Sequence, residues 1–471
     1  MQIFNTMSRK KETFVPLIPG RVSIYSCGPT VYNYFHLGNA RPFITFDTLR
    51  RYFEYQGYQV DFVQNFTDID DKMINKANAE GTTVKELADQ FIKEYYVDAK
   101  GLNIKEATHH PRATESMVEI VRLIETLVEK GYAYTADDGV YYSVRKFPDY
   151  CGLSHFDIDE LVQNSRKDVL VDSGKQDPVD FALWKFRKEI EPFWPSPWGE
   201  GRPGWHIECS AMSKKYLGES IDIHSGGQDL IFPHHENEIA QSEAASGKQF
   251  VRYWMHNGFI NVNGEKMSKS EGNFFLVRDV ANKFGYMPIR LFMLSSHYRT
   301  PINYTPDLLN AAASGFARIQ TAMKTLNFVL ASPLEPSNAE AAAAQKASLE
   351  EACRLAVEHF EAAMDDDLNT ADALGSIFEL VRIANTESAA PLSQEGLVLA
   401  KDTLERLCEV MGFSFVEEGA IPQEVLDLAE ARQVAKKERN FALADSLRAE
   451  IQQRGYRITD TPQGPHIEAE A

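Results

Sequence analysis

Residues 266–270 read KMSKS, which places Lys266 and Lys269 three positions apart in a short polar segment. The residues before it, 263–265, read NGE, and the residues after it, 271–273, read EGN, so a glycine flanks the lysines on each side. A loop of this kind can close over a polyphosphate and stabilise the negative charge that develops during group transfer. The alternative without a function is that these residues form a solvated charged loop.

A second signature, HLGN at residues 36–39, lies 230 residues earlier. Residues 21–27 alternate apolar and polar side chains and predict a strand, whereas 39–56 carries apolar residues at helical spacing and predicts a helix. His36, Gly38 and Asn39 therefore fall at a helix N-terminus, where free N–H groups attract phosphate. Gly38 would let the backbone approach a nucleotide closely.

The alternation of strand and helix continues on both sides of a long interruption. It predicts strands at 58–65, 221–224 and 253–260 and helices at 68–79, 205–217 and 233–245. Such units build a parallel sheet through right-handed crossovers. Residues 95–203 interrupt the pattern with a helix over 115–130 and a strand over 139–144. The predicted fold is α/β: a Rossmann-like parallel-sheet catalytic domain split by an insertion, then a mostly helical C-terminal half.

Composition is that of a soluble globular enzyme, with 44% hydrophobic and 25% charged residues. We find no apolar run of the ~18 residues that a membrane span needs, and no apolar region typical of a signal peptide. Five scattered cysteines, at 27, 151, 209, 353 and 408, favour a reducing compartment over a disulfide framework. We therefore expect a cytoplasmic protein without membrane contact.

The net charge of −19 argues against non-specific binding of nucleic acid. A basic island on this acidic chain is nevertheless found within residues 432–457. It contains Arg432, Lys436, Lys437, Arg439, Arg448, Arg454 and Arg457 against three acidic residues. On charge alone, a solvated helix face is favoured over an RNA contact as the explanation of this island.

Residues 226–238, GGQDLIFPHHENE, suggest a metal site. A proline at the first helical position is favoured, and Pro233 would then place His234 and Glu238 four residues apart on one helix face. Cys27 ends a predicted strand, at the edge where α/β active sites gather. Cys209 lies in the helix predicted over 205–217. Spacing alone does not exclude an alternative to a metal site, in which the cysteines are ordinary buried residues and the histidine and glutamate form a surface pair.

Five segments together resemble the cysteinyl-tRNA synthetases, a family of class I aminoacyl-tRNA synthetases. They are CGPTVY at 27–32, HLGNAR at 36–41, NFTDIDDK at 65–72, GWHIECS at 204–210 and FPHHENE at 232–238. The resemblance covers the whole chain and is most specific in 21–75 and 204–275. It implies that ATP with Mg²⁺ activates L-cysteine as an adenylate, and that the cysteinyl group then passes to tRNA(Cys). It also implies a monomer.

The resemblance carries roles to particular residues. It implies one Zn²⁺ held by Cys27, Cys209, His234 and Glu238. His206, His224 and His235 either surround the metal or are ordinary hydrogen-bonded histidines of the core. His36, Asn39, Lys266 and Lys269 would be catalytic, and ATP would also contact Gly38. Gly227 and Asp229 either contact ATP, as similar class I segments do, or form a tight turn before a helix. The family signature usually ends in histidine where this chain has Asn39, which donates a hydrogen bond but has no titratable proton. The remaining sites are substrate contacts at Gly28, Thr67 and Trp205 and tRNA contacts at Arg432, Lys436, Lys437 and Arg439.

The resemblance also labels five parts of the chain. The catalytic domain comprises 1–94 and 204–275, and 95–203 is a connective insertion. A helical stem region at 276–331 follows, then a helical anticodon-side bundle at 332–415, which opens on a low-complexity connector at 332–346. Residues 416–471 form a small C-terminal tRNA-binding unit.

Three other functions compete with this one. A related ligase transfers cysteine to an amino sugar through the same adenylate, and it resembles residues 1–300 equally well but lacks the basic C-terminal segment. A zinc hydrolase could use His234, His235 and Glu236, although the chain lacks a His-Glu-x-x-His helix and the lysines would remain unexplained. A non-catalytic RNA-binding relative would have no need of the lysines or the metal ligands.

Overall fold

The computed structural model describes residues 1–160, 174–262, 264–267, 274–331, 338–415, 423–461 and 464–469. These residues form two compact units. The first comprises 1–316, 360–374 and 409–413, and the second comprises 317–359, 375–408 and 414–471. Within the described ranges, none of the helices combines the length and apolar character that crossing a bilayer requires.

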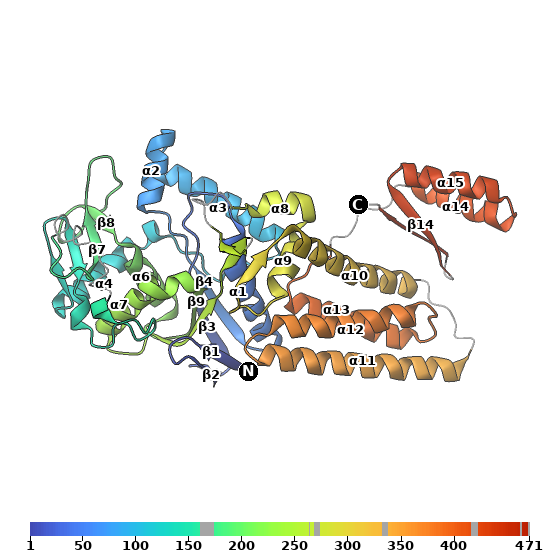
Figure 1. The fold of residues 1–471 in the computed structure, drawn as a ribbon, viewed down its shortest axis with the longest axis horizontal. Coiled ribbons are helices and arrows are strands. Elements are labelled where there is room, and N and C mark those ends of the chain that lie inside the picture. The colour runs from blue at the N-terminus through green and yellow to red at the C-terminus, as the bar shows by residue number, and fades with distance from the viewer. Residues whose placement is uncertain are drawn as a thin grey trace. The chain divides into compact units, whose positions relative to one another are not determined.

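The first unit is built on a parallel sheet of four strands in the order β10-β9-β3-β4 (Figure 1). The strands are β3 (Arg21–Ser26), β4 (Gln59–Gln64), β9 (Ile221–Gly227) and β10 (Val251–Asn257). Helix α1 (Leu37–Tyr55) is the crossover from β3 to β4. The predicted α/β fold class with a split parallel sheet is therefore confirmed, and all four strands end at the same edge.

The helices of the first unit pack against this sheet. Helix α1 contacts β4, β9 and β10. Helices α4 (Met117–Glu129), α6 (Trp205–Leu217) and α7 (Glu236–Ser246) contact one another and share a hydrophobic core with sheet residues such as Tyr25 and Val63. Burial on that scale is the main stabilising contribution, at roughly 25 cal/mol per Å² of apolar surface.

Side chains fix where several helices begin. The Asp70 carboxylate accepts the Met73 N–H at the start of α2 (Asp71–Glu80). Thr83 and Glu86 form a reciprocal capping box at the start of α3 (Val84–Gly101). Such caps satisfy N–H groups that the first helical turn leaves without partners.

The insertion contains an antiparallel sheet in the order β5-β6-β7-β8. Its strands are β5 (Ala133–Thr135), β6 (Gly139–Tyr142), β7 (Phe181–Phe186) and β8 (Gly201–Pro203). The insertion was expected to begin at residue 95, which lies inside α3. The five residue ranges given above for the parts of the chain stay a prediction.

Two local expectations were wrong. Pro233 does not open a helix: it follows a cis peptide bond in an irregular stretch, Ile231–His235, and α7 begins at Glu236. Phe232 has extended backbone angles because the residue before a proline is disfavoured in the helical region. The expected connector at 332–346 is also shorter, because α11 begins at Ala339. Its alanine, glutamate, glutamine and lysine residues are good helix formers.

The remaining elements complete the two units. The N-terminal strands β1 (Gln2–Asn5) and β2 (Lys10–Thr13) pair with each other. A three-stranded sheet has the order β12-β11-β13. Its strands are β11 (Ile260–Val262), β12 (Glu265–Lys266) and β13 (Ile302–Tyr304), and the helices nearby in sequence are α8 (Val277–Phe284) and α9 (Tyr286–Leu294).

The helical part of the chain confirms the expectation of a helical C-terminal half. It contains α10 (Pro306–Ala331), α11 (Ala339–Asp365), α12 (Thr370–Ser388) and α13 (Gln394–Val410). The tail has its own small core, in which Val425, Ala429, Ile451 and Ile458 are buried. Its elements are α14 (Gln423–Lys437), α15 (Phe441–Gln453), β14 (Tyr456–Thr461) and β15 (Gly464–Ala469).

Candidate active site

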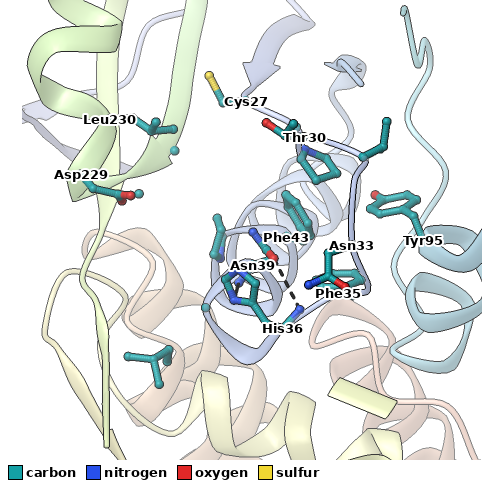
Figure 2. A pocket seen from close by; sticks show the side chains of 18 of the residues that line it. Cys27, Thr30, Asn33, Phe35, His36, Asn39, Phe43, Tyr95, Asp229 and Leu230 are labelled. Carbon is teal, nitrogen blue, oxygen red and sulfur yellow. Dashed lines mark hydrogen bonds between the residues drawn. The ribbon is translucent and has the colours of Figure 1, made fainter. Parts of the chain in front are cut away.

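A cavity of about 360 Å³ opens at the edge where the parallel strands end (Figure 2). Its lining includes the residues that follow β3, the first turn of α1, the end of β9 and the turn after β10. Ligands of open α/β sheets bind at this edge. Of the residues predicted to contact a substrate or a metal, the lining contains Cys27, Gly28, His36, Gly38, Asn39, Trp205, Gly227 and Asp229.

The N-terminus of α1 provides one wall of the cavity. His36 caps the helix: its Nδ1 accepts the Asn39 N–H at 3.3 Å, and the Asn39 side chain accepts the His36 N–H at 3.4 Å. Figure 2 draws this pair beside the cavity. A β-carbon on Gly38 would come within 2.9 Å of His36 Nδ1 and 3.1 Å of Met267 Cε. Only glycine therefore fits between the capping histidine and Met267.

The lysine-bearing hairpin reaches the same cavity. Met267 lines it, and the Met267 N–H donates to the Ile260 carbonyl at 3.1 Å. Lys266 ends strand β12, where it is paired with Asn261 of β11. Lys269 lies outside the described residues, and Lys266 is placed only by its backbone position in the hairpin of β11 and β12. On the opposite side, Gly227 ends β9 and Asp229 follows it.

Four buried side chains converge beside the cavity. The ligand atoms of Cys27, His234, His235 and Glu238 all lie within 4.8 Å of one another. Cys27 Sγ is 3.3 Å from His235 Nε2, and His234 Nε2 is 3.0 Å from Glu238 Oε1. Cys209 is hydrogen-bonded to Cys27 and to His234. The structure thus brings all four predicted metal ligands together and adds His235 to them.

Further polar groups orient this cluster. His224 Nε2 is 3.0 Å from Glu238 Oε2, and His206 Nδ1 is 3.0 Å from His234 Nδ1. His235 Nδ1 is 2.8 Å from His256 Nε2, and His256 Nδ1 is 2.8 Å from the Thr6 hydroxyl. Hydrogen bonds of this kind fix the ring orientation and tautomer of metal-binding histidines.

Opposite charges within the cluster shift one another's pKa values. Burial alone would raise the pKa of Glu238, but His224 and His234 lower it to about 2. Burial would likewise lower the pKa of His234, and Glu238 raises it to about 10. The hydrogen bond with Cys27 lowers the pKa of Cys209 to about 6. The buried Glu238 and Cys209 side chains therefore favour their anionic forms. Burial instead keeps the pKa of Cys27 high.

The donor set fits a metal ion on chemical grounds. Thiolate, imidazole and carboxylate are the ligand types of zinc sites in proteins. Ionisable groups that are fully buried are costly unless they are paired or coordinate a metal. Cys27 and Cys209 are each hydrogen-bonded to a histidine of the cluster.

Other substrate contacts predicted from the sequence have different surroundings. The Gly28 N–H donates to Asn65 Oδ1 at 3.0 Å. Trp205 lies over the imidazole of His234, with ring centroids 4.3 Å apart, and is 44% exposed. Thr67 does not line the cavity: it is buried, and its hydroxyl accepts from Asn65 Nδ2 at 3.2 Å. The Thr67 hydroxyl therefore supports Asn65, and its contact with the substrate stays a prediction.

Sequence reasoning overlooked several residues of this region. His256 and Asn257 end β10 at the same edge as Cys27, so the rule that led to Cys27 applies to them too. Phe91 and Tyr95 line the cavity from α3, a helix that was not predicted. The capping box formed by Thr83 and Glu86 is the signal that would have revealed this helix.

The basic island of the tail divides into two kinds of residue. Arg432 is buried and binds both oxygens of the Asp460 carboxylate, at 2.8 and 3.0 Å. Lys436 Nζ lies 2.7 Å from the same carboxylate. Lys437 and Arg439 are exposed. Arg432 therefore forms an ion pair within the tail. The exposed Lys437 and Arg439 are better placed to bind an external anion.

Comparisons with known proteins agree with this geometry. Residues 13–314 match the family model of the catalytic domain of class I (C) tRNA synthetases, and residues 359–416 match the DALR domain. A cysteine--tRNA ligase of Caldicellulosiruptor saccharolyticus is 54% identical over 476 residues, which cover 99% of each chain.

Solved structures show the same fold at low identity. Methionyl-tRNA synthetase of Mycobacterium tuberculosis, in complex with methionyl-adenylate, matches 83% of this chain and 89% of its own, with a TM-score of 0.61 and 17% identity. A leucyl-tRNA synthetase, agnB2 LeuRS of Agrobacterium radiobacter K84, in a ternary complex with tRNA and LeuAMS, matches 84% of each chain, with a TM-score of 0.61 and 12% identity. The chain belongs to the class I aminoacyl-tRNA synthetases, in the cysteine--tRNA ligase family.

Proposed function

We propose that this chain activates L-cysteine with ATP and transfers it through a cysteinyl-adenylate to tRNA(Cys). One observation carries the proposal: a helix N-terminus, the base of the lysine hairpin and Cys27, the cavity-facing member of the buried donor set, all border one cavity. These are the parts that phosphate binding, charge stabilisation and recognition of a thiol require.

In activation, the cysteine carboxylate attacks the α-phosphate of ATP and pyrophosphate leaves. The N-terminus of α1 would present the positive end of the helix dipole to the phosphates. His36 and Asn39 would donate further hydrogen bonds there, and Gly227 and Asp229 would contact the nucleoside. Lys266 and Lys269 would neutralise the leaving pyrophosphate, together with Mg²⁺ bound to ATP.

Selection of cysteine would depend on the buried cluster. We assign one Zn²⁺ per chain to Cys27, Cys209, His234 and Glu238, with His224 and His206 orienting two of these ligands. A bound zinc ion would act as a Lewis acid that binds a thiol and favours its deprotonation. A site built to bind one polar group can discriminate by ~10⁴-fold or more without proofreading. Gly28 and Trp205 would bound the amino-acid side of the cavity.

Transfer requires tRNA, and we assign its recognition in part to exposed tail residues such as Lys437 and Arg439. The protein would act as a cytoplasmic monomer. The alternative with an amino-sugar acceptor is not supported, because a cysteine--tRNA ligase aligns with 99% of the chain and a DALR domain matches residues 359–416.

The test is amino-acid-dependent exchange of pyrophosphate into ATP, followed by charging of tRNA(Cys). We expect exchange with cysteine and hardly any with serine or alanine. Lys269→Ala should lower the activation rate by about 10²-fold, as the loss of a transition-state donor does. Lys283→Ala is the matched control, because Lys283 is an exposed lysine of α8 that does not line the cavity. Equal exchange with serine would contradict selection through the thiol.

A further inference from the structure

We propose that Arg41 is a positioning residue for activation, which holds the base of the lysine hairpin in register with the helix that His36 begins. The inference rests on the proposed function, because it concerns the geometry of the same cavity. Arg41 lies five residues after His36, in the second turn of α1, and its side chain is fully buried.

The guanidinium bridges two turns that are far apart in sequence. Its Nη1 donates to the carbonyls of Gly258 and Phe259, at 2.9 and 2.8 Å. Its Nη2 donates to the carbonyl of His297 at 3.3 Å and to that of Thr300. One planar group with a fixed fork of donors thus sets the spacing of both turns, which a lysine ammonium cannot reproduce.

Both turns lead directly into the sheet that carries the lysine loop. Gly258 and Phe259 line the cavity and are followed by β11, which pairs with β12 and with β13. Thr300 is followed by β13. The turns are closely packed, because a β-carbon on Gly258 would approach the Arg299 carbonyl to 2.7 Å. Arg41 therefore anchors the base of the whole three-stranded sheet.

The second turn is also held from its other side. The buried carboxylate of Asp367 accepts from Arg299 Nε at 2.8 Å and from the Tyr298 hydroxyl at 2.9 Å. With Asp367 on one side and Arg41 on the other, the turn at 297–300 has little freedom to shift. Arg41 adds a direct link between that turn and α1, beside the packing of α9 on α1.

The partners of Arg41 are unusual for a buried arginine. In the described part of the chain, its four hydrogen-bond acceptors are all backbone carbonyls, and its Nε has no partner. Burial lowers its pKa to about 10. Arg290 is equally buried but binds the carboxylate of Asp47. A buried cation without an opposite charge is a costly arrangement, and a purely structural site would be served better by a pair of the Arg290 kind.

The bridge makes a specific kinetic prediction. If Arg41 only stabilised the fold, its loss would lower activity and stability together. If it positions the hairpin, the reacting groups are misplaced in a protein that still binds cysteine, because Cys27 and the donor set do not contact Arg41. A misplacement of about 1 Å can cost about 10²-fold in rate.

The experiment compares Arg41→Lys and Arg41→Met with Arg290→Lys, the matched change at another fully buried arginine. Cysteine-dependent pyrophosphate exchange gives kcat and the KM values for ATP and cysteine, thermal unfolding gives stability, and elemental analysis gives zinc content. For Arg41→Lys we expect kcat to fall about 10- to 100-fold, with the cysteine KM within about twofold of wild type and zinc unchanged. Arg290→Lys should lower the unfolding temperature and leave kcat within about twofold.

Two results would overturn the inference: a folded Arg41→Lys protein with wild-type kcat, or a loss of kcat that follows the fall in stability equally in both arginine variants. If the Arg41 variants do not fold, Gly258→Ala decides, because it crowds the same two turns while leaving Arg41 in place; wild-type kcat there would reject the inference. Absence of exchange by the wild-type protein would reject the proposed function instead.

Discussion

Replacing Gly28 with alanine should separate the ends of the neighbouring strands β3 and β4. A β-carbon at this position would lie 1.6 Å from the Asn65 carbonyl oxygen and 2.7 Å from its carbon. Real β-carbons essentially never approach another heavy atom closer than 3.0 Å. The chain after β3 and the chain after β4 must therefore move apart by at least about 1.4 Å. Backbone atoms obstruct the methyl group, so no side-chain rotation relieves the contact.

The shift acts on function more strongly than on stability. Forcing an extra methyl group into a packed site typically costs about 1–3 kcal/mol, which should lower the unfolding temperature by only a few degrees. Cys27 precedes Gly28 directly, and the Gly28 N–H is bound to Asn65 Oδ1. Displacement of about 1 Å beside a reacting group costs about 10²-fold. We therefore expect the catalytic efficiency for cysteine in pyrophosphate exchange to fall by about 10²-fold.

Gly375→Ala provides the control. Gly375 lies in α12, and a β-carbon there would meet nothing within 4 Å. Alanine is the better helix former by about 0.5–1 kcal/mol, so this variant should be slightly more stable and fully active. Both variants are assayed for pyrophosphate exchange, thermal unfolding and zinc content. A Gly28→Ala protein with wild-type kinetics would refute the argument, because it would mean that the strand ends separate without disturbing the site.

Three further predictions concern the metal and the tail. Cys209→Ser should lose zinc and raise the KM for cysteine, whereas Cys353→Ser should change neither; retained zinc and normal kinetics in the Cys209 variant would exclude it as a ligand. Replacing Lys437 and Arg439 by alanine should raise the KM for tRNA(Cys) and reduce the salt dependence of binding, because contacts to phosphate release counterions. Arg432→Ala should instead destabilise the tail through the loss of its pair with Asp460, which thermal unfolding would report.

Regular periodicity predicted the framework of the catalytic domain well. The helix expected over 205–217 is observed as Trp205–Leu217, and the strand expected over 21–27 is observed as Arg21–Ser26. In both segments the local conformational preference and the pattern of burial favour the same structure. Tertiary contacts therefore did not change the predicted element. Pro233 is different, because its peptide isomer and the angles of Phe232 depend on how the chain packs there.

The buried donor set around Cys27 and Glu238 could be predicted from the sequence only in part. Cys27 and Glu238 are 211 residues apart, and only the parallel register of β3 and β9 brings their neighbourhoods together. The resemblance named the ligands, but the contact of His224 with Glu238 required coordinates. For Arg432 the sequence predicted an external partner, the phosphate of tRNA. The structure shows an internal partner, Asp460, in a strand 28 residues later.

Helix α1 connects these observations. Asn39 takes the place of the usual histidine, and its side chain accepts the His36 N–H as glutamate or glutamine does in a capping box. Because His36 Nδ1 accepts the Asn39 N–H, a neutral His36 ring must carry its proton on Nε2 and can donate only from there. In the proposed function, the first turn would thus fix which atom His36 offers to phosphate. One turn later, Arg41 donates to the carbonyls of Gly258 and Phe259, directly before β11. A single helix thus carries both the His36 donor on one side of the cavity and the group that binds the base of the opposing hairpin.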